Sequence, residues 1–325
     1  MEKGNGREYR KLLGAAAHAP RASSGILAKP LIKNALTIDL EDYYQVSAFA
    51  EQIPPDQWKA QPSRVEANTE RILALLAKHG WKATFFTLGW VAEEHPTLLK
   101  RIAGLGHEVG CHSLRHLCVH EMKQEEFRED TRRAKELLED ASGAKVSGYR
   151  APSFSINESC PWAFETLVQC GFSYDSSIFP VRHPNYGSPA TPRFPYVIET
   201  KAGPLLEFPM PTLCLGDRRS PFGGGAYLRL LPYWFTRWAF RFLNEKEGQA
   251  GCVYLHPWEL DPEQPRMKGS LTAKLRHYIG LRGFERKLGR LMADFEFAPL
   301  GELVSELRFR REEALTPELV PVGRQ

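Results

Sequence analysis

The stretch SRVEANTERILALLAKHGWKATFFTLG, from Ser63 to Gly89, shows the pattern that repeats through most of this chain. In its first part apolar residues recur at intervals of three and four, which predicts an amphipathic helix that Ser63 opens and Gly80 ends. The second part, KATFFTLG, is a short apolar run of the kind that forms a strand. A helix that leads directly into a strand is the unit from which parallel α/β folds are built.

The same alternation extends in both directions along the chain. Short apolar runs predict further strands at 35–40, 107–112, 145–150, 172–175 and 251–256. Periodic segments predict helices at 93–106, 124–143, 160–171 and 230–248, and from residue 270 onward. Between Arg182 and Gly225, Pro and Gly interrupt short runs, which predicts an insertion of short strands and loops. This order favours an α/β fold with a parallel sheet or barrel over an all-β or all-α fold.

The composition is that of an average soluble globular protein, with 42% hydrophobic and 25% charged residues. The net charge of +4 is dispersed and forms no basic stripe with interleaved aromatic residues, so we expect no nucleic-acid partner. No apolar run approaches the roughly 18 residues that a transmembrane helix needs. Residues 1–33 lack periodicity and predict a mobile tail, and the apolar part of LLGAAAHAPRA is too short and alanine-rich for a secretory signal.

The six cysteines lack the paired spacing of a disulfide scaffold. Most of them lie in apolar surroundings, where free thiols are commonly buried. A reducing compartment follows from this pattern, and we expect a cytoplasmic protein.

Polar or titratable residues follow the predicted strands where each strand ends. These residues are Asp39, His112, Arg150, Asp175 and His256. In parallel α/β folds the carboxyl ends of the strands meet at one face, where active sites are built. We therefore expect these five side chains to converge on one pocket, although they lie far apart in the sequence.

The segment GHEVGCHSLRH, from Gly106 to His116, contains a candidate metal site. His112 and His116 are four residues apart, so on a helical turn both imidazoles would point the same way and could bind one Zn²⁺. Ser113 stands where the metalloprotease motif has a Glu, which excludes that motif. Two alternatives are a pair of histidines without metal and a structural zinc site that includes Cys111 and Cys118.

Three acids lie close together in TIDLEDYY. Asp39, Glu41 and Asp42 fall at a predicted strand end, where mutual repulsion is costly unless a cation or an arginine offsets it. Arg150 could pair with one of them, and a metal ion held by the histidines could bind another. An acidic turn in water is the alternative.

Five short segments together resemble the motifs of the polysaccharide deacetylases, the NodB-homology group of carbohydrate esterases. They are TIDLED, HSLRH, RAPSFS, YDSS and YLHPWE, in the family's order, and the resemblance covers about residues 35 to 260. It implies a distorted (β/α)7-type barrel with inserted short strands and C-terminal helices. It also implies hydrolysis of N-acetyl groups on a sugar polymer with a divalent metal, most often Zn²⁺. FGGGAYLRLLPY and the C-terminal helices resemble the subgroup found with PEP-CTERM/exosortase exopolysaccharide loci, which implies a role in exopolysaccharide biosynthesis.

The resemblance also implies catalytic roles for four of the residues at strand ends. Asp39 matches the family's catalytic base, and Arg150 matches the arginine that holds this base. His256 matches the catalytic histidine that protonates the departing amine, and Asp175 matches the acid that tunes this histidine. We expect a backbone N–H near Ser153 to stabilise the oxyanion.

The metal ligands implied by the family are His112, His116 and one acid of the first motif. That motif normally has adjacent acids, base then ligand, but here Leu40 separates Asp39 from Glu41 and Asp42. Asp42 is preferred as the third ligand because its short side chain matches the usual one, whereas a register one residue earlier would select Glu41.

The expected organisation is a barrel domain at 34–265 and a helical extension at 266–325 that packs on it. The expected function is metal-dependent N-deacetylation of a glycan. The alternatives are hydrolysis of a small amide or cyclic imide on the same scaffold, and an inactive relative that only binds glycan.

Overall fold

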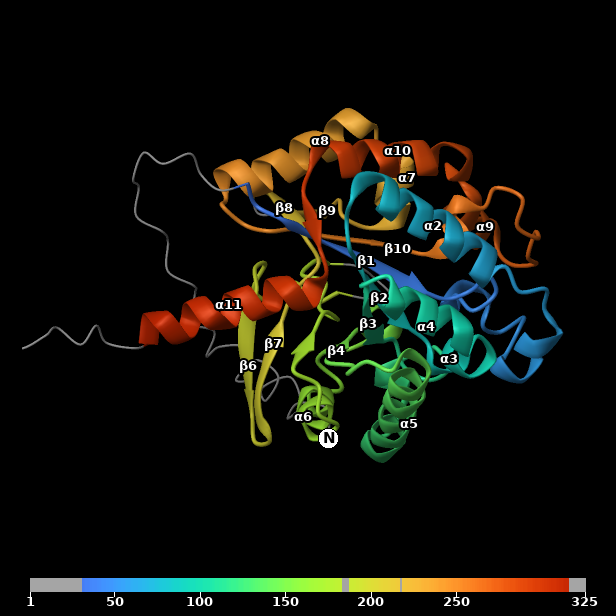
Figure 1. The fold of residues 1–325 in the computed structure, drawn as a ribbon, viewed down its shortest axis with the longest axis horizontal. Helices are drawn as coiled ribbons and strands as arrows, with labels where there is room; N and C mark the ends of the chain where they lie inside the picture. The colour runs from blue at the N-terminus through green and yellow to red at the C-terminus, as the bar shows by residue number, and fades with distance from the viewer. Residues whose placement is uncertain (1–30, 183–186, 217, 316–325) are drawn as a thin grey trace, which may run out of the picture.

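The computed structural model describes residues 31–182, 187–216 and 218–315, so most of the predicted N-terminal tail lies outside the described residues. Its centre is a nine-stranded sheet in the order β10-β1-β2-β3-β4-β5-β7-β6, with β11 paired to β1 (Figure 1). The strands are β1 (Asn34–Leu40), β2 (Thr84–Thr87), β3 (Glu108–Cys111), β4 (Gly148–Tyr149), β5 (Tyr174–Asp175), β6 (Tyr196–Thr200), β7 (Gly203–Glu207), β10 (Cys252–Leu255) and β11 (Phe297–Ala298). All neighbours run parallel except β6 and β7.

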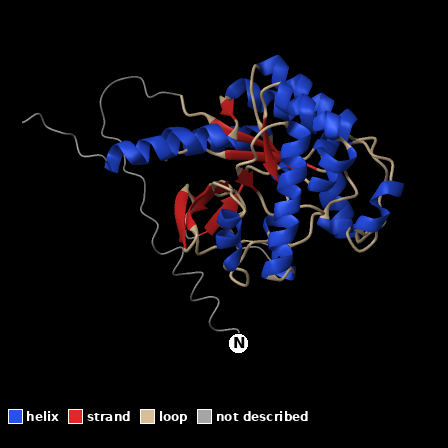
Figure 2. Cartoon of the chain, turned by 60° about the horizontal axis from the view of Figure 1, so that its bottom comes forward, coloured by secondary structure: helices blue, strands red, loops and turns tan. Residues whose placement is uncertain are grey.

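Helices surround this sheet, as Figure 2 shows by colour. They are α2 (Val65–His79), α3 (Gly89–Glu94), α4 (Pro96–Gly104), α5 (Gln124–Ser142), α6 (Trp162–Gln169), α7 (Gly225–Leu230), α8 (Tyr233–Arg241), α9 (Leu271–Tyr278), α10 (Leu281–Asp294) and α11 (Leu300–Leu315). Short 3-10 turns are η1 (Ser47–Phe49), η2 (Pro55–Ala60), η3 (Val119–Glu121), η4 (Pro152–Phe154) and η6 (Pro257–Leu260), and η5 (Phe242–Lys246) is a π turn. The predicted α/β class is confirmed, and the curved parallel sheet with outer helices is a distorted barrel.

The helix and the strand predicted from 63–89 are both present, but the residue before the helix is Arg64 and not the predicted Ser63. All seven residues of β1 and all four of β2 are buried, because helices cover both faces of a parallel sheet. The helix α2 ends at Gly80, whose φ of 75° is the left-handed conformation that glycine adopts without strain.

The region between Arg182 and Gly225 contains the predicted short strands. β6 and β7 form an antiparallel hairpin at one edge of the sheet, and β8 (Thr212–Leu215) pairs with β9 (Arg218–Pro221) in a separate small sheet. The helix predicted at 230–248 is present as α8 and the π turn η5, but it begins only at Tyr233, because Pro232 separates it from α7.

The C-terminal region also differs in part from the prediction. Helices α9, α10 and α11 are present, but β11 lies between the last two and pairs with Asn34 and Ala35 of β1. A two-residue strand carries too little periodicity to be recognised in a sequence. The division of the chain at residue 265 stays a prediction.

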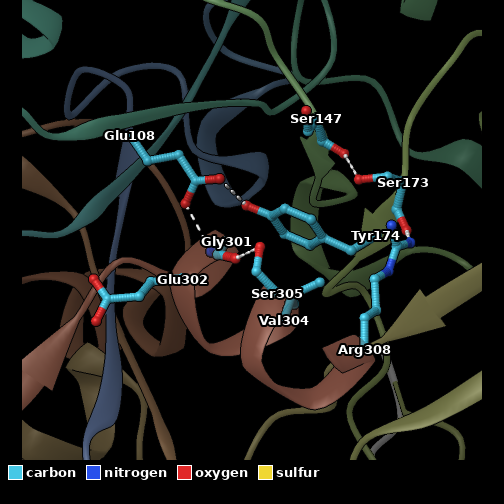
Figure 3. Close-up of a pocket in the computed structure, with 9 residues that line it drawn as sticks. All are labelled: Glu108, Ser147, Ser173, Tyr174, Gly301, Glu302, Val304, Ser305 and Arg308. Carbon is cyan, nitrogen blue, oxygen red and sulfur yellow. Dashed lines mark hydrogen bonds between the residues drawn. The ribbon is translucent and has the colours of Figure 1, made fainter. Parts of the chain in front are cut away.

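At the amino-terminal ends of β3 and β5, the helix α11 closes a small pocket (Figure 3). The Glu108 carboxylate accepts hydrogen bonds from the Tyr174 hydroxyl at 2.8 Å, the Thr84 hydroxyl at 2.5 Å and the Gly301 N–H at 2.9 Å. A carboxylate at a helix N-terminus is also favoured by the helix dipole. This pocket therefore anchors α11, at the end of the sheet opposite to the candidate active site.

The six cysteines all lie in the described part of the chain, and all are free. Within that part, no helix has the length and apolar character needed to cross a membrane.

Candidate active site

The predicted residues at strand ends lie at one end of the sheet. Asp39 is the next-to-last residue of β1. His112, Arg150 and His256 directly follow β3, β4 and β10. Since these strands are parallel, their carboxyl ends face the same way. Asp175 ends β5 at the same level, paired with Tyr149 of β4.

Three side chains form a group that could hold a metal ion. Glu41, His112 and His116 each place one possible ligand atom within 4.8 Å of the others. The Glu41 Oε2 atom lies 3.0 Å from His116 Nε2, and this buried oxygen has no hydrogen-bond partner. A buried carboxylate oxygen whose one close neighbour is an imidazole nitrogen is costly, and a cation between the two would satisfy both. Two imidazoles and a carboxylate are also the donor set of a catalytic zinc site, so the residues fit the metal.

Neighbouring groups set the orientation and the charge state of these side chains. The His112 Nδ1 atom donates a hydrogen bond to the Arg150 carbonyl oxygen at 2.7 Å, which leaves Nε2 as the free ligand atom. Burial lowers the pKa of His112 to about 4, so this imidazole is neutral. Burial by itself raises the pKa of Glu41, but the nearby His116 lowers it to about 2. The second oxygen of Glu41 accepts a hydrogen bond from the Trp258 indole at 3.3 Å.

The two histidines converge through a loop and not through a helical turn. Ser113 and His116 have φ values of 67° and 56°, in the left-handed region that a helix does not use. The His116 N–H donates to Ser113 Oγ at 3.0 Å, which closes the loop and places the two imidazole centres 5.4 Å apart. The predicted convergence is present, but the helical geometry predicted for it is wrong.

The preference for Asp42 as the third ligand does not fit the structure. Its carboxylate accepts hydrogen bonds from Ser63 Oγ at 2.8 Å and from the Arg64 and Val65 N–H groups at 2.7 and 3.1 Å. These amides form the start of α2, so Asp42 holds the helix N-terminus. The acid beside the histidines is Glu41.

Asp39 and Arg150 form a buried ion pair. The Arg150 Nη1 atom lies 2.7 Å from Asp39 Oδ1, and the two side chains are 0% and 4% exposed. Arg150 also donates hydrogen bonds to Thr37 Oγ1 at 2.7 Å and to Ser176 Oγ at 3.1 Å. These contacts fix the guanidinium, so one oxygen of Asp39 is held and Oδ2 lies 4.0 Å from His256 Nε2.

The acid hydrogen-bonded to the His256 ring is Glu259, which the sequence did not identify as a site residue. The His256 Nδ1 atom lies 3.3 Å from Glu259 Oε2, and Glu259 Oε1 accepts a hydrogen bond from Arg229 Nε at 2.7 Å. Burial opposes the charged imidazole, but the hydrogen bond to Glu259 and the charges of Glu41 and Asp39 raise the pKa of His256 to about 9. The sequence signal was the spacing in HPWE, in which the acid follows the histidine by three residues.

Asp175 has different partners from those predicted. Its Oδ1 atom accepts a hydrogen bond from Ser177 Oγ at 2.6 Å, and its carboxyl group is paired with Glu207. Burial and the charge of Asp175 raise the pKa of Glu207 well above its usual value, which favours the protonated form of Glu207 beside Asp175. The described carboxylates within 4.0 Å of His256 are those of Asp39, Glu41 and Glu259, so Asp175 does not contact the histidine.

Aromatic rings support His256 on its other side. The imidazole stacks on Trp258 with ring centres 4.9 Å apart, and Trp258 stacks on His277 of α9 at 4.1 Å. Arg229 also donates to the carbonyl oxygens of His277 and Ile279 at 2.9 and 2.6 Å. The C-terminal helices thus help to fix the position of His256.

The predicted alternative of a structural zinc site is not formed as described. Cys111 is fully buried, and Cys118 lies near His120 and Glu121 in the other group of possible ligands among the described residues. Cys111 and Cys118 do not share a group.

Comparison with known proteins agrees with this geometry. Residues 56–173 match the family model "Polysaccharide deacetylase", and residues 176–305 match a domain of unknown function, DUF3473. A 98-residue segment is 37% identical to a peptidoglycan-N-acetylglucosamine deacetylase of Bacillus cereus, covering 30% of this chain and 36% of the relative. A 113-residue segment is 31% identical to a peptidoglycan deacetylase of Helicobacter pylori, covering 35% of this chain and 38% of the relative. The chain thus spans well under half the length of both relatives.

A solved structure supports the fold over a longer range. A protein from Mycobacterium smegmatis that is assigned to the polysaccharide deacetylases superimposes with a TM-score of 0.55 at 20% identity, over 94% of this chain and 99% of that one. The fold and the cluster at its strand ends define the class as a distorted α/β barrel of the NodB type. Residues 56–173 carry a polysaccharide deacetylase domain, as the resemblance of the motifs implied.

Proposed function

We propose that this chain is a metal-dependent hydrolase that removes N-acetyl groups from an N-acetylated glycan. The observation that carries the proposal is that three features lie together at one end of the sheet. They are the Asp39 carboxylate held by Arg150, the His256 imidazole beside it, and the possible metal ligands Glu41, His112 and His116. The family match and the names of the relatives, which act on peptidoglycan or are called chitooligosaccharide deacetylases, support the substrate class.

Glu41, His112 and His116 would hold the metal, and zinc suits this donor set best. When bound, such an ion supplies Lewis-acid polarisation of a carbonyl and lowers the pKa of bound water.

Asp39 is the proposed general base. Arg150 holds its Oδ1 atom, so Oδ2 stays directed toward His256 and the metal group and can accept the proton of the attacking water. Because the pair is buried, the carboxylate cannot turn away without leaving the Arg150 charge unpaired.

His256 is the proposed general acid. Its Nδ1 atom is held by Glu259, and its Nε2 atom lies 3.7 Å from Glu41 and 4.0 Å from Asp39, on the side where the scissile amide would sit. A pKa of about 9 keeps the imidazole protonated at neutral pH, ready to give its proton to the departing amine. An oxyanion contact near Ser153, whose hydroxyl lies 2.7 Å from Ser47 Oγ, remains part of the proposal.

We further propose that the natural substrate is a polymer of exopolysaccharide biosynthesis. The support is the resemblance of FGGGAYLRLLPY and the C-terminal helices to the exopolysaccharide-locus subgroup.

The test is acetate release from a panel of N-acetylated oligosaccharides, with O-acetylated sugars and cyclic imides as competing substrates. We expect release from N-acetylated sugars, and a loss of roughly 10²–10⁴-fold in Asp39→Asn with the metal retained. Turnover of cyclic imides alone, or a fully active Asp39→Asn variant, would contradict the proposal.

A further inference from the structure

An exposed aromatic stripe runs along the outer side of α8. Trp234 and Trp238, one helical turn apart, are 69% and 43% exposed, and Leu230 just before them is 51% exposed. The rings of Trp234, Phe235, Trp238 and Phe242 form a continuous series with successive centres 5.9, 5.5 and 5.8 Å apart. Exposed apolar side chains that gather in this way mark an interaction surface.

Arginines border this stripe on α8 and on the neighbouring α10. Arg237, Arg241 and Arg290 line a groove between the two helices, which both lie along the top of the molecule in Figure 1. Arg237 pairs with Asp294 at 2.8 Å, and the Arg290 guanidinium lies 4.1 Å from the centre of the Tyr233 ring. Asp294 is the only acid among the described residues that line the groove, so positive charge is in excess there.

The surface lies away from the candidate active site. Phe240 of α8 packs on Phe295 with ring centres 5.5 Å apart, and Phe295 leads into β11, which pairs with Asn34 at the start of β1. Asp39 and His256 lie at the other ends of β1 and β10. An occupant on α8 would therefore leave the catalytic end of the sheet open.

We propose that the aromatic–arginine face, formed by Trp234, Trp238, Arg237, Arg241 and Arg290, docks on a lipid bilayer that contains anionic phospholipids. Tryptophan side chains concentrate at the level of lipid headgroups, where an apolar ring and a polar N–H are both satisfied. Arginines near an anionic bilayer surface add electrostatic attraction. Binding of this kind is peripheral and requires no membrane-spanning helix. The excess positive charge favours an anionic surface over an uncharged glycan.

Co-sedimentation of the full chain with vesicles tests this proposal. Vesicles of phosphatidylcholine with phosphatidylglycerol should bind the wild-type protein, and pure phosphatidylcholine vesicles should bind it much less. Arg241→Glu should weaken binding to the anionic vesicles by about tenfold or more, because each basic residue near the surface contributes roughly fivefold and the new carboxylate is repelled. The double variant Trp234→Ala/Trp238→Ala should weaken binding by a similar factor, because it removes the two rings that enter the headgroup layer. Raising the salt concentration should weaken binding further.

Matched controls use exposed residues on other elements. Leu105→Ala, which removes a side chain that is 41% exposed, and Arg133→Glu on the exposed side of α5 should bind like wild type. Arg241→Glu alters a single exposed side chain, so it keeps the test valid if the double tryptophan variant misfolds. Equal binding to both vesicle types, unchanged binding by the α8 variants, or binding only to an acidic peptide or a glycan would overturn the proposal. None of these residues is in the catalytic cluster, so these outcomes leave the proposed deacetylase activity untouched.

Discussion

At the scale of single residues, Glu41 and Asp42 show how neighbours in the chain separate into different roles. Past the end of β1 the backbone turns, so Glu41 points toward His116 and Asp42 points toward the start of α2. The sequence shows both acids but not the direction of this turn. The choice between them depended on side-chain length, which the turn overrides.

This difference predicts distinct outcomes for two alanine variants. Glu41→Ala should lose bound zinc, because the third ligand is removed. Asp42→Ala should keep zinc but lower the free energy of unfolding by about 1–2 kcal/mol, because the first amides of α2 lose their acceptor. Elemental analysis and thermal unfolding separate the two effects. Loss of zinc in Asp42→Ala with full zinc in Glu41→Ala would reverse the assignment.

The partner of His256 leads to a second prediction. Glu259→Gln removes a negative charge beside the imidazole, so the pKa of His256 should fall and the alkaline limb of the pH–rate profile should move to lower pH. Asp175→Asn should leave this limb in place, because Asp175 is paired with Glu207.

Circular dichroism and zinc content serve as controls for this pair of variants, because Glu259→Gln also removes the carboxylate that forms an ion pair with Arg229. A shift of the alkaline limb in Asp175→Asn, with none in Glu259→Gln, would restore the role that the family pattern assigns to Asp175.

At the scale of elements, the alternation of helices and strands was predictable because each element carries its own period and end signals. The burial of β1 and the end of α2 at Gly80 follow from such local signals. Two features did not follow from them. The loop from His112 to His116 depends on positive φ at Ser113 and His116, and β11 exists only through its pairing with β1.

The anchoring of α11 leads to a prediction at this scale. Glu108→Ala removes the acceptor for Tyr174, Thr84 and the Gly301 N–H, so the free energy of unfolding should fall by roughly 2–4 kcal/mol. Glu302→Ala, which breaks an exposed ion pair with Lys33, is the matched control and should cost about 0–1 kcal/mol. Urea unfolding measures both. Equal effects would show that Glu108 does not anchor the helix.

At the scale of the whole molecule, buried neutral histidines tie stability to pH. Burial lowers the pKa of His107 to about 4 and that of His277 to about 3, whereas both titrate near 6.5 when exposed. The unfolded chain therefore binds more protons than the folded chain below about pH 6.5, and stability should fall as the pH falls through this range.

Thermal unfolding from about pH 7 to about pH 4.5 measures this loss, to which His107 should contribute roughly 1–3 kcal/mol. Its Nδ1 atom accepts a hydrogen bond from the Ala83 N–H at 3.3 Å, and an asparagine can supply the same acceptor without titrating. His107→Asn should therefore flatten the acid side of the stability curve. A curve that superimposes on wild type would remove His107 as a cause.

The whole molecule also shows why the candidate site was only partly predictable. Asp39, His112, Arg150 and His256 could be found because strand ends converge in any parallel fold. Glu259 and its partner Arg229 could not be found in the same way, because they meet through the packing of α7, η6 and α9.

Acetate release from an N-acetylated oligosaccharide, measured before and after removal of bound metal, tests the central claim most directly. We predict that release stops when a chelator has removed the metal and returns when zinc is added back, because Glu41, His112 and His116 would again hold the ion. An unchanged rate in protein shown by elemental analysis to be free of metal would contradict a metal-dependent deacetylase.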